Sequence, residues 1–213
     1  MKKDLTELVF VLDMSGSMSD LTDDTIGGFN SLIKDQKEGE GEALVSTVLF
    51  NTSTRVLHDR LPISEVEEMT HREYRAGGGT ALLDALGGAI HHISNVHKYA
   101  REEDVPEKTL VVVTTDGMEN SSRIYTYSKV KEMVERKQKE GWEFMFMGAN
   151  IDAYESGERM GFRKERISNY IPDERGTRLV YESANSAIKH LRSFDKIEDS
   201  WNVELDADFS FRK

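Results

Sequence analysis

The 213-residue sequence contains no cysteine, which excludes thiol catalysis, disulfide bonds and cysteine-ligated zinc. Basic residues are also in the minority: 28 Lys and Arg stand against 39 Asp and Glu, for a formal net charge of −11. Such a balance does not favour nucleic acid or anionic membranes, which bind basic surfaces. No apolar run approaches the ~20 residues of a membrane span. We therefore expect partners other than nucleic acids and membranes.

The start of the chain, Met-Lys-Lys-Asp, leads directly into a polar-interrupted strand pattern and lacks the apolar stretch of a secretory signal. With the lack of cysteine, this predicts a cytoplasmic protein. A chain of this size buries about 70% of its surface on folding, enough for one large domain. Only 3 prolines leave little material for a stiff linker. We expect a domain over residues 1–196 and a C-terminal tail over residues 197–213.

Two stretches, Leu5 to Leu12 and Lys108 to Thr114, are rich in strand-forming residues and contain the apolar runs Leu8 to Leu12 and Leu110 to Val113, as expected of strands buried on both faces. Further strands are predicted over Ala43 to Phe50, Arg55 to Leu61, Trp142 to Met147 and Arg166 to Ile171. Apolar residues at helical spacing predict helices over Thr25 to Lys37, Ala81 to Tyr99, Tyr125 to Glu140, Asp152 to Met160 and Glu174 to Phe194. This alternation predicts an α/β fold: a doubly wound, mostly parallel sheet with helices on both faces.

Three details of this outline rest on local patterns. Only Asn51, Thr52 and Ser53 separate the second and third strands, so the third should be antiparallel and lie at a sheet edge. Ser64 with Glu67 resembles a capping box and predicts a short helix. From Val203 to Phe211 every second residue is apolar, which favours an edge strand. Pairing of this tail with another chain and disorder are the alternatives.

Oxygen-bearing side chains follow the two central strands. Asp13 ends the first strand and is followed by Ser15 and Ser17, while Asp116 follows the strand that ends at Thr114. Thr80 comes directly after three consecutive glycines, which permit close backbone approach. Carboxyl ends of strands converge where the strand order of an open sheet reverses, and ligands bind there. Hydroxyls with at most two carboxylates form a hard, all-oxygen set that suits Mg²⁺ or Mn²⁺.

Three motifs together carry a family resemblance. Asp-x-Ser-x-Ser ends the first strand, Gly-Gly-Thr-Ala-Leu-Leu-Asp-Ala-Leu opens a helix, and Thr-Asp-Gly follows a later strand. In this combination and order the sequence resembles a von Willebrand factor A domain. The later segment Met147 to Ala153 is similar to stand-alone intracellular bacterial and phage members. The resemblance implies a Rossmann-like sheet of strand order 3-2-1-4-5-6 and a metal-ion-dependent adhesion site.

The resemblance also implies a role for each site residue. Ser15 and Ser17 would bind the ion directly, Thr80 and Asp116 directly or through water, and Asp13 mostly through water while anchoring its loop. One coordination position would stay open for an Asp or Glu of a partner protein. This implies a Mg²⁺-dependent binding module and not an enzyme, without catalytic or cofactor-binding residues.

Two other functions remain as alternatives. A metal-dependent phosphoryl-transfer or hydrolytic enzyme would use the same ion, although the sequence places no histidine near the two serines. An assembly element would use the tail strand. An EF-hand loop beginning at Asp13 is excluded, because Met18 occupies the position that requires glycine. Asp84 lies in the first turn of its helix, where a carboxylate is favoured by the helix dipole, so we expect it to cap that helix.

Overall fold

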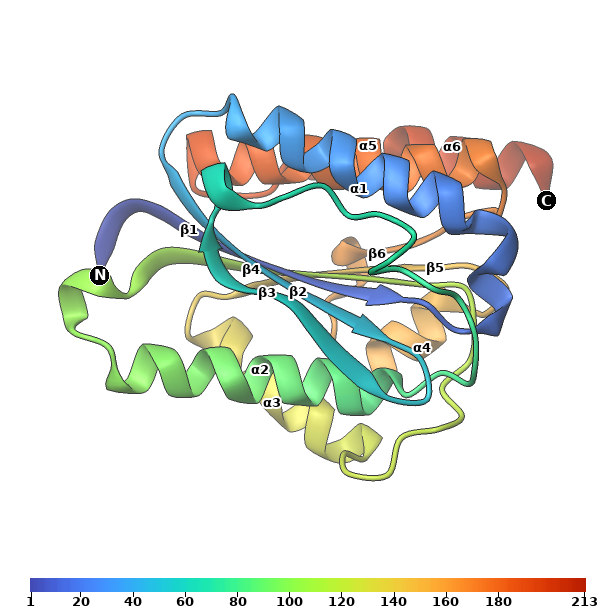
Figure 1. Ribbon diagram of the computed structural model, residues 1–213, viewed down its shortest axis with the longest axis horizontal. Coiled ribbons are helices and arrows are strands. Elements are labelled where there is room, and N and C mark those ends of the chain that lie inside the picture. The colour runs from blue at the N-terminus through green and yellow to red at the C-terminus, as the bar shows by residue number, and fades with distance from the viewer.

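Strand β1 (Lys2–Asp13) runs through the middle of a six-stranded sheet in the computed structural model, which describes residues 1–213 (Figure 1). The strand order is β3-β2-β1-β4-β5-β6, and only β3 is antiparallel to its neighbour. The other strands are β2 (Glu42–Phe50), β3 (Thr54–Pro62), β4 (Pro106–Thr115), β5 (Glu143–Gly148) and β6 (Ile167–Asn169). The predicted fold, strand order and antiparallel edge are therefore confirmed.

The composition of β1 explains its central place. All nine residues from Leu5 to Asp13 are buried. Alternate side chains of a strand point to opposite faces, so Leu8 and Phe10 enter one apolar core while Val9 and Val11 enter the other. Each face of the sheet thus has its own core, and both cores meet at β1.

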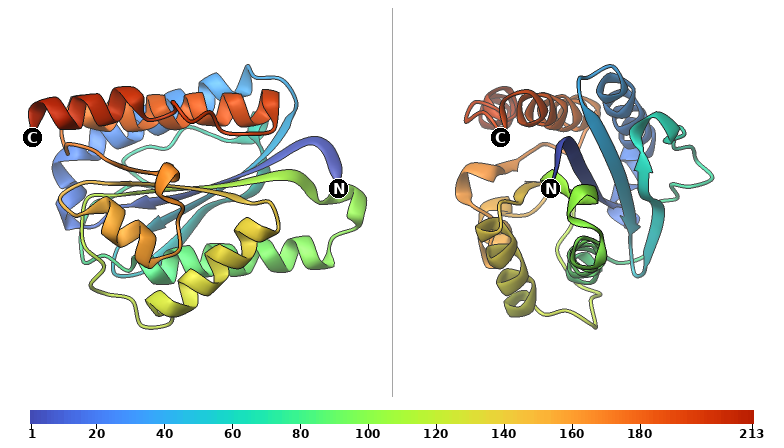
Figure 2. Two further views of the ribbon diagram at one scale, coloured as in Figure 1. Left: turned by 180° about the vertical axis from the view of Figure 1, so that it is seen from behind. Right: turned by 90° about the vertical axis from the view of Figure 1, so that its left-hand side faces the viewer.

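Helices cover both faces of the sheet (Figure 2). One layer consists of α1 (Thr22–Lys37), α5 (Glu174–Phe194) and α6 (Val203–Arg212). The opposite layer consists of α2 (Leu82–Tyr99), α3 (Tyr127–Lys139) and α4 (Ala153–Arg159). Because the chain moves outward from β1 to β3 and then returns to β4, the strand order reverses between β1 and β4. None of the helices combines the length and apolar content needed to cross a membrane.

The expected tail strand is wrong, because Val203–Arg212 forms helix α6. The apolar residues do not all share one face: Leu205 is buried, whereas Val203 and Phe211 are exposed. The acidic residues between them decide the outcome. Asp208 is buried against Arg212 four residues later, the spacing of one helical turn, and Asp206 accepts a hydrogen bond from Ser168 of β6. The helix lies beside α5 and the short edge strand β6 (Figure 2).

The helix predicted from the Ser64 and Glu67 pair is also wrong. Only a 3-10 turn, Ile63–Glu65, forms there. Beyond this turn the chain makes tertiary hydrogen bonds and not helical ones. The Asn30 side chain of α1 donates to the Met69 carbonyl and accepts from the Met69 N–H, each at 2.8 Å. A local capping pattern is therefore overridden by an amide from another element.

Candidate metal centre

Asp13 shapes the loop that follows β1. Its carboxylate is fully buried, and its Oδ1 accepts a hydrogen bond from the Ser15 N–H at 2.7 Å. Its Oδ2 accepts one from the Thr115 hydroxyl of β4 at 2.6 Å. Burial raises the pKa of the Asp13 carboxyl above its ordinary value, although these hydrogen bonds oppose the shift. Both oxygens are thus engaged by the protein, which fixes the loop.

The two serines and Asp116 form a chain of hydrogen bonds across the two central strands. The hydroxyl oxygens of Ser15 and Ser17 lie 3.1 Å apart, and the Ser17 hydroxyl donates to Asp116. Ser15 and Asp116 are buried, whereas Ser17 is exposed to solvent. Burial raises the pKa of the Asp116 carboxyl as well, despite the bond from Ser17.

Thr80 joins this group from the glycine loop. A Cβ built on Gly117 would lie 3.3 Å from Thr80 Oγ1 and 3.4 Å from Ser17 Oγ, so both hydroxyls flank this glycine. The glycine loop approaches the Asp13 loop through its backbone, with the Gly16 N–H donating to the Gly78 carbonyl at 3.0 Å. Gly78 has φ +82°, a left-handed conformation that disfavours side chains. The structure therefore brings all five predicted site residues together.

The donor chemistry of this site is unusual for its low charge. Two carboxylates and three hydroxyls converge, and the protein contains no group of three or more His, Cys, Asp or Glu side chains arranged to hold a metal. A hard divalent cation would fit such oxygens while retaining several waters. It would also favour the charged forms of the two buried carboxyls.

Several supporting residues are not apparent from sequence spacing. Tyr74 is buried, and its hydroxyl donates to the main-chain carbonyl of Asp13. The loop after Asp116 is tied to the glycine loop, because Asn120 Oδ1 accepts the Thr80 N–H at 2.9 Å. Glu119 accepts the Leu83 N–H at 2.9 Å and so caps α2. Only the polar composition of this loop hinted at such a role.

The expectation that Asp84 caps its own helix is wrong. Its carboxylate instead accepts three main-chain N–H bonds, from Arg123 at 2.8 Å, Ile124 at 2.9 Å and Tyr125 at 2.8 Å. It thereby fastens the far end of the loop that carries Asp116. Partial burial opposes ionisation, yet the three N–H donors together lower the pKa of Asp84 below its ordinary value.

Replacing Asp84 by Ala is expected to lower the free energy of unfolding by about 1–3 kcal/mol at pH 7, since three donors lose a charged acceptor. A lowered folded-state pKa means that the carboxylate stabilises the fold above the unfolded pKa. This contribution is lost as the pH falls through the folded pKa. In urea unfolding, the difference in free energy of unfolding between wild type and variant should therefore shrink as the pH falls below about 4. Asp20→Ala, an exposed aspartate of the Asp13 loop, is the control, and an equal effect there would contradict the prediction.

The strand order, with one antiparallel edge strand and helices on both faces, is that of a von Willebrand factor A fold. A family model described as VWA domain containing CoxE-like protein matches residues 2–159, and the chain belongs to this family. A comparison with curated proteins finds no match.

Solved structures share the fold at low sequence identity. The von Willebrand factor domain of the type V pili tip protein Mfa5 from Porphyromonas gingivalis has a TM-score of 0.64 and 10% identity, covering 91% of this chain and 98% of that one. The von Willebrand factor type A protein from Catenulispora acidiphila has a TM-score of 0.56 and 13% identity, covering 85% and 42%. Proximal thread matrix protein 1 from the mussel byssus, with a zinc-occupied metal-ion-dependent adhesion site, has a TM-score of 0.57 and 14% identity, covering 84% and 44%. The chain thus spans less than half the length of the last two.

Proposed function

We propose that the chain is a protein-binding module that holds Mg²⁺ at Asp13, Ser15, Ser17, Thr80 and Asp116, and coordinates an Asp or Glu of a partner protein through that ion. The supporting observation is the convergence of three hydroxyls and two buried carboxylates at the reversal point of the sheet. The mussel protein of the same fold, with its zinc-occupied site, is a precedent for metal binding at this position. A cytoplasmic location and a protein partner, not nucleic acid or a membrane, are part of the proposal.

The charge of the site supports an anionic partner group. Two carboxylates at most neutralise a divalent cation, and hydroxyl ligands add no charge, so the ion retains attraction for one further carboxylate. Because both Asp13 oxygens already accept hydrogen bonds from the protein, we assign Asp13 to anchoring the loop and to water-mediated contact. Ser17 is exposed, which leaves the ion approachable from solvent. Hard oxygen ligands favour Mg²⁺, with Mn²⁺ next.

The alternative, a metal-dependent hydrolase or phosphoryl-transfer enzyme, lacks a supporting observation. Such chemistry needs a general base within reach of the ion. Histidine is the usual base, and the six histidines bond elsewhere: His58 to Thr47, His71 to Asp23, His91 to Tyr125, His92 to Asp59, His97 to Glu7 and His190 to the Lys196 carbonyl. We therefore prefer the binding function.

Selection from a displayed random-peptide library in Mg²⁺ tests this proposal. Enriched peptides should share an Asp or Glu, and replacing it by Asn or Gln should weaken binding at least about tenfold, or about 1.4 kcal/mol. EDTA and Ser15→Ala should have the same effect. Ser19→Ala is the matched control. The Ser19 hydroxyl donates to the Gly16 carbonyl at 2.7 Å and does not bond any of the five proposed metal-binding residues. Peptides that bind equally well in EDTA would refute the metal bridge.

A further inference from the structure

The loop between β4 and α3, residues 116–126, begins at Asp116 and runs past the first turn of α2 (Figure 1). It carries two large apolar side chains that are exposed to solvent: Met118 is 71% exposed and Ile124 is 79% exposed. Isolated exposed apolar residues are common on protein surfaces and carry no meaning by themselves. The polar residues between these two make this loop unusual.

The four residues that follow Met118 have polar side chains that all form hydrogen bonds within the protein: Glu119, Asn120, Ser121 and Ser122. Glu119 fastens the loop to the first turn of α2, since its Oε2 accepts the Leu83 N–H at 2.9 Å. Asp84 of α2 fastens the far end by accepting the Ile124 N–H at 2.9 Å. The loop is thus fixed by its polar groups, whereas Met118 and Ile124 remain in solvent.

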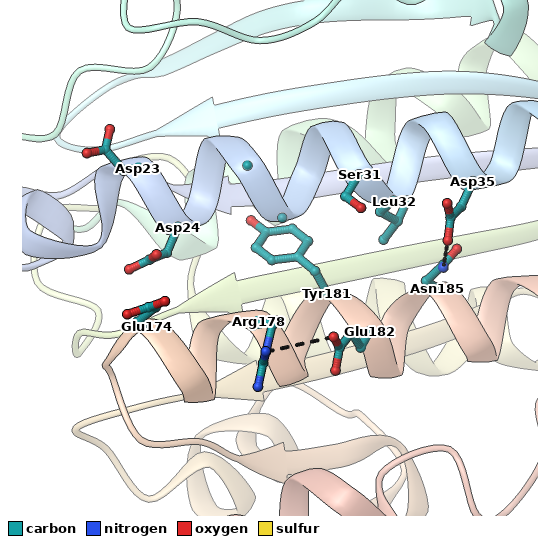
Figure 3. Close-up of a pocket in the computed structure, with 12 residues that line it drawn as sticks. Asp23, Asp24, Ser31, Leu32, Asp35, Glu174, Arg178, Tyr181, Glu182 and Asn185 are labelled. Atoms are coloured by element: carbon teal, nitrogen blue, oxygen red, sulfur yellow. Dashed lines mark hydrogen bonds and ion pairs between the residues drawn. The ribbon is translucent and has the colours of Figure 1, made fainter.

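The open groove between α1 and α5, of about 430 Å³, shows the ordinary arrangement of an exposed surface (Figure 3). Its lining is mostly polar, and side chains there pair with one another, as Arg178 does with Glu182 at 3.8 Å and Asn185 with Asp35 at 2.8 Å. The two apolar side chains of its lining are both buried. The loop after β4 has the opposite arrangement, with bonded polar groups and exposed apolar ones.

Met118 lies beside the candidate metal centre. It directly follows Gly117, where a built Cβ would lie 3.3 Å from the Thr80 hydroxyl oxygen and 3.4 Å from that of Ser17. Neighbouring Cα atoms are about 3.8 Å apart, so one peptide unit separates Met118 from the glycine that both hydroxyls flank. Ser17 is exposed as well. A group that approaches the ion from solvent therefore comes within reach of the methionine side chain.

We propose that the partner segment that coordinates the ion also places a large apolar side chain against Met118, with Ile124 as a second contact farther along the loop. This inference rests on the proposed metal bridge. An ion that accepts any carboxylate does not distinguish one acidic segment from another, so neighbouring contacts must supply the specificity. The partner motif is then an Asp or Glu flanked by a large apolar residue.

The physical properties of the loop suit this role. Hydrogen bonds already fix its backbone, so binding does not carry the cost of ordering it. Methionine is unbranched and flexible, and it adapts to aliphatic and aromatic side chains alike. Burial of its exposed surface against an apolar side chain removes both from water, which favours the complex.

Two displayed peptide libraries test this inference separately from the metal bridge. Both have random residues around a fixed central position, which is Asp in one library and Asn in the other. In Mg²⁺, wild type should retain the Asp library in preference to the Asn library, and the retained peptides should be enriched in Leu, Ile, Met, Phe or Trp beside the Asp. Met118→Gln should keep the preference for Asp and lose the apolar enrichment.

Polarisation measurements with one enriched, fluorescein-labelled peptide give the size of the effect. Met118→Gln, a change of similar shape, should weaken binding about tenfold, because it removes an apolar contact. Replacing the apolar residue of the peptide by Ser should weaken binding to wild type about tenfold, but binding to the variant less than about threefold. In wild type, the methyl resonance of Met118, identified by its absence from the variant, should shift on binding.

Tyr99→Gln is the control, because it also removes a large apolar side chain that is 78% exposed. Tyr99 ends α2, and the 18 residues of this helix place it about 25 Å from the metal end, so binding should change less than about twofold. Retention of the Asp library without apolar enrichment, or equal effects of Met118→Gln and Tyr99→Gln, would overturn the inference and leave the metal bridge standing. Equal retention of both libraries would refute the metal bridge, and this inference with it.

Discussion

Metal-stripped protein is expected to unfold at a higher temperature when Mg²⁺ is added, and Asp13→Ala is expected to remove this response. A ligand that binds only the folded state stabilises it by about 2.7 kcal/mol at one hundred times its dissociation constant. At about 2–4 °C per kcal/mol for a chain of this size, the midpoint should rise by roughly 5–10 °C. Titrations of both proteins with Mg²⁺, Mn²⁺ and Ca²⁺ in a thermal shift assay measure this.

The comparison must use the response to metal and not the absolute midpoint. Asp13→Ala leaves the Ser15 N–H and the Thr115 hydroxyl without their acceptor, yet it also removes a carboxylate that burial disfavours. These effects oppose one another in metal-free protein. An unchanged response to Mg²⁺ in the variant would contradict the assigned role of Asp13.

The stabilisation of the fold by Mg²⁺ is expected to increase with pH. The pKa values of Asp13 and Asp116 are raised in the metal-free fold, so these carboxyls hold protons to a higher pH than in the unfolded chain. They therefore make the metal-free fold less stable as the pH rises through their folded pKa values. Mg²⁺ competes with these protons, so its stabilising effect should grow as the pH rises through the folded pKa values of the two carboxyls.

Arg60→Met is expected to lower the free energy of unfolding by about 3–5 kcal/mol, the cost of leaving a buried charge unpaired. Glu7 of β1 has no exposed side-chain surface, and Arg60 Nε lies 3.1 and 2.9 Å from its two oxygens. His97 Nε2 of α2 lies 3.2 Å from Glu7 Oε2. Removing the guanidinium leaves only the imidazole beside this carboxylate, and urea unfolding measures the loss.

Two controls identify the cause of that loss. Adding Glu7→Gln to Arg60→Met removes the buried charge and should restore most of the stability. Arg101→Met also removes an arginine that pairs with a carboxylate, Asp104 at 2.8 Å, but its side chain is 75% exposed. Such surface pairs contribute about 0–1 kcal/mol. If Arg60→Met costs no more than Arg101→Met, the buried pair does not have the importance assigned to it.

The main outline of the fold was predictable because its signals are local and strong. Leu8 to Leu12 and Leu110 to Val113 are continuous apolar runs, and central strands of a sheet covered on both faces suit them. Once both are parallel neighbours, the groups at their carboxyl ends must converge. The meeting of Asp13 with Asp116 across about one hundred residues thus follows from topology alone.

The parts that sequence reasoning missed depend on distant contacts. Asp84 accepts bonds from residues about forty positions later, and no local spacing distinguishes this from a helix cap. In the tail, the alternating apolar residues fit a strand. The helix is supported by the ion pair of Asp208 with Arg175 of α5, which cannot be seen in the local sequence pattern. Tertiary partners decide such cases over local pattern.

The side-by-side position of α1 and α5 has a consequence for how the chain folds. The Gln36 amide of α1 is fully buried and donates to the side-chain oxygen of Asn185 in α5 at 2.7 Å, across 149 positions of sequence. Strand β1 likewise lacks one of its neighbours until β4 has been made. During synthesis on the ribosome, the apolar surfaces of the N-terminal segments therefore stay unburied until their partner segments have been synthesised. Such long-range closure slows folding, and the nascent N-terminal half is the stretch that most needs chaperone protection.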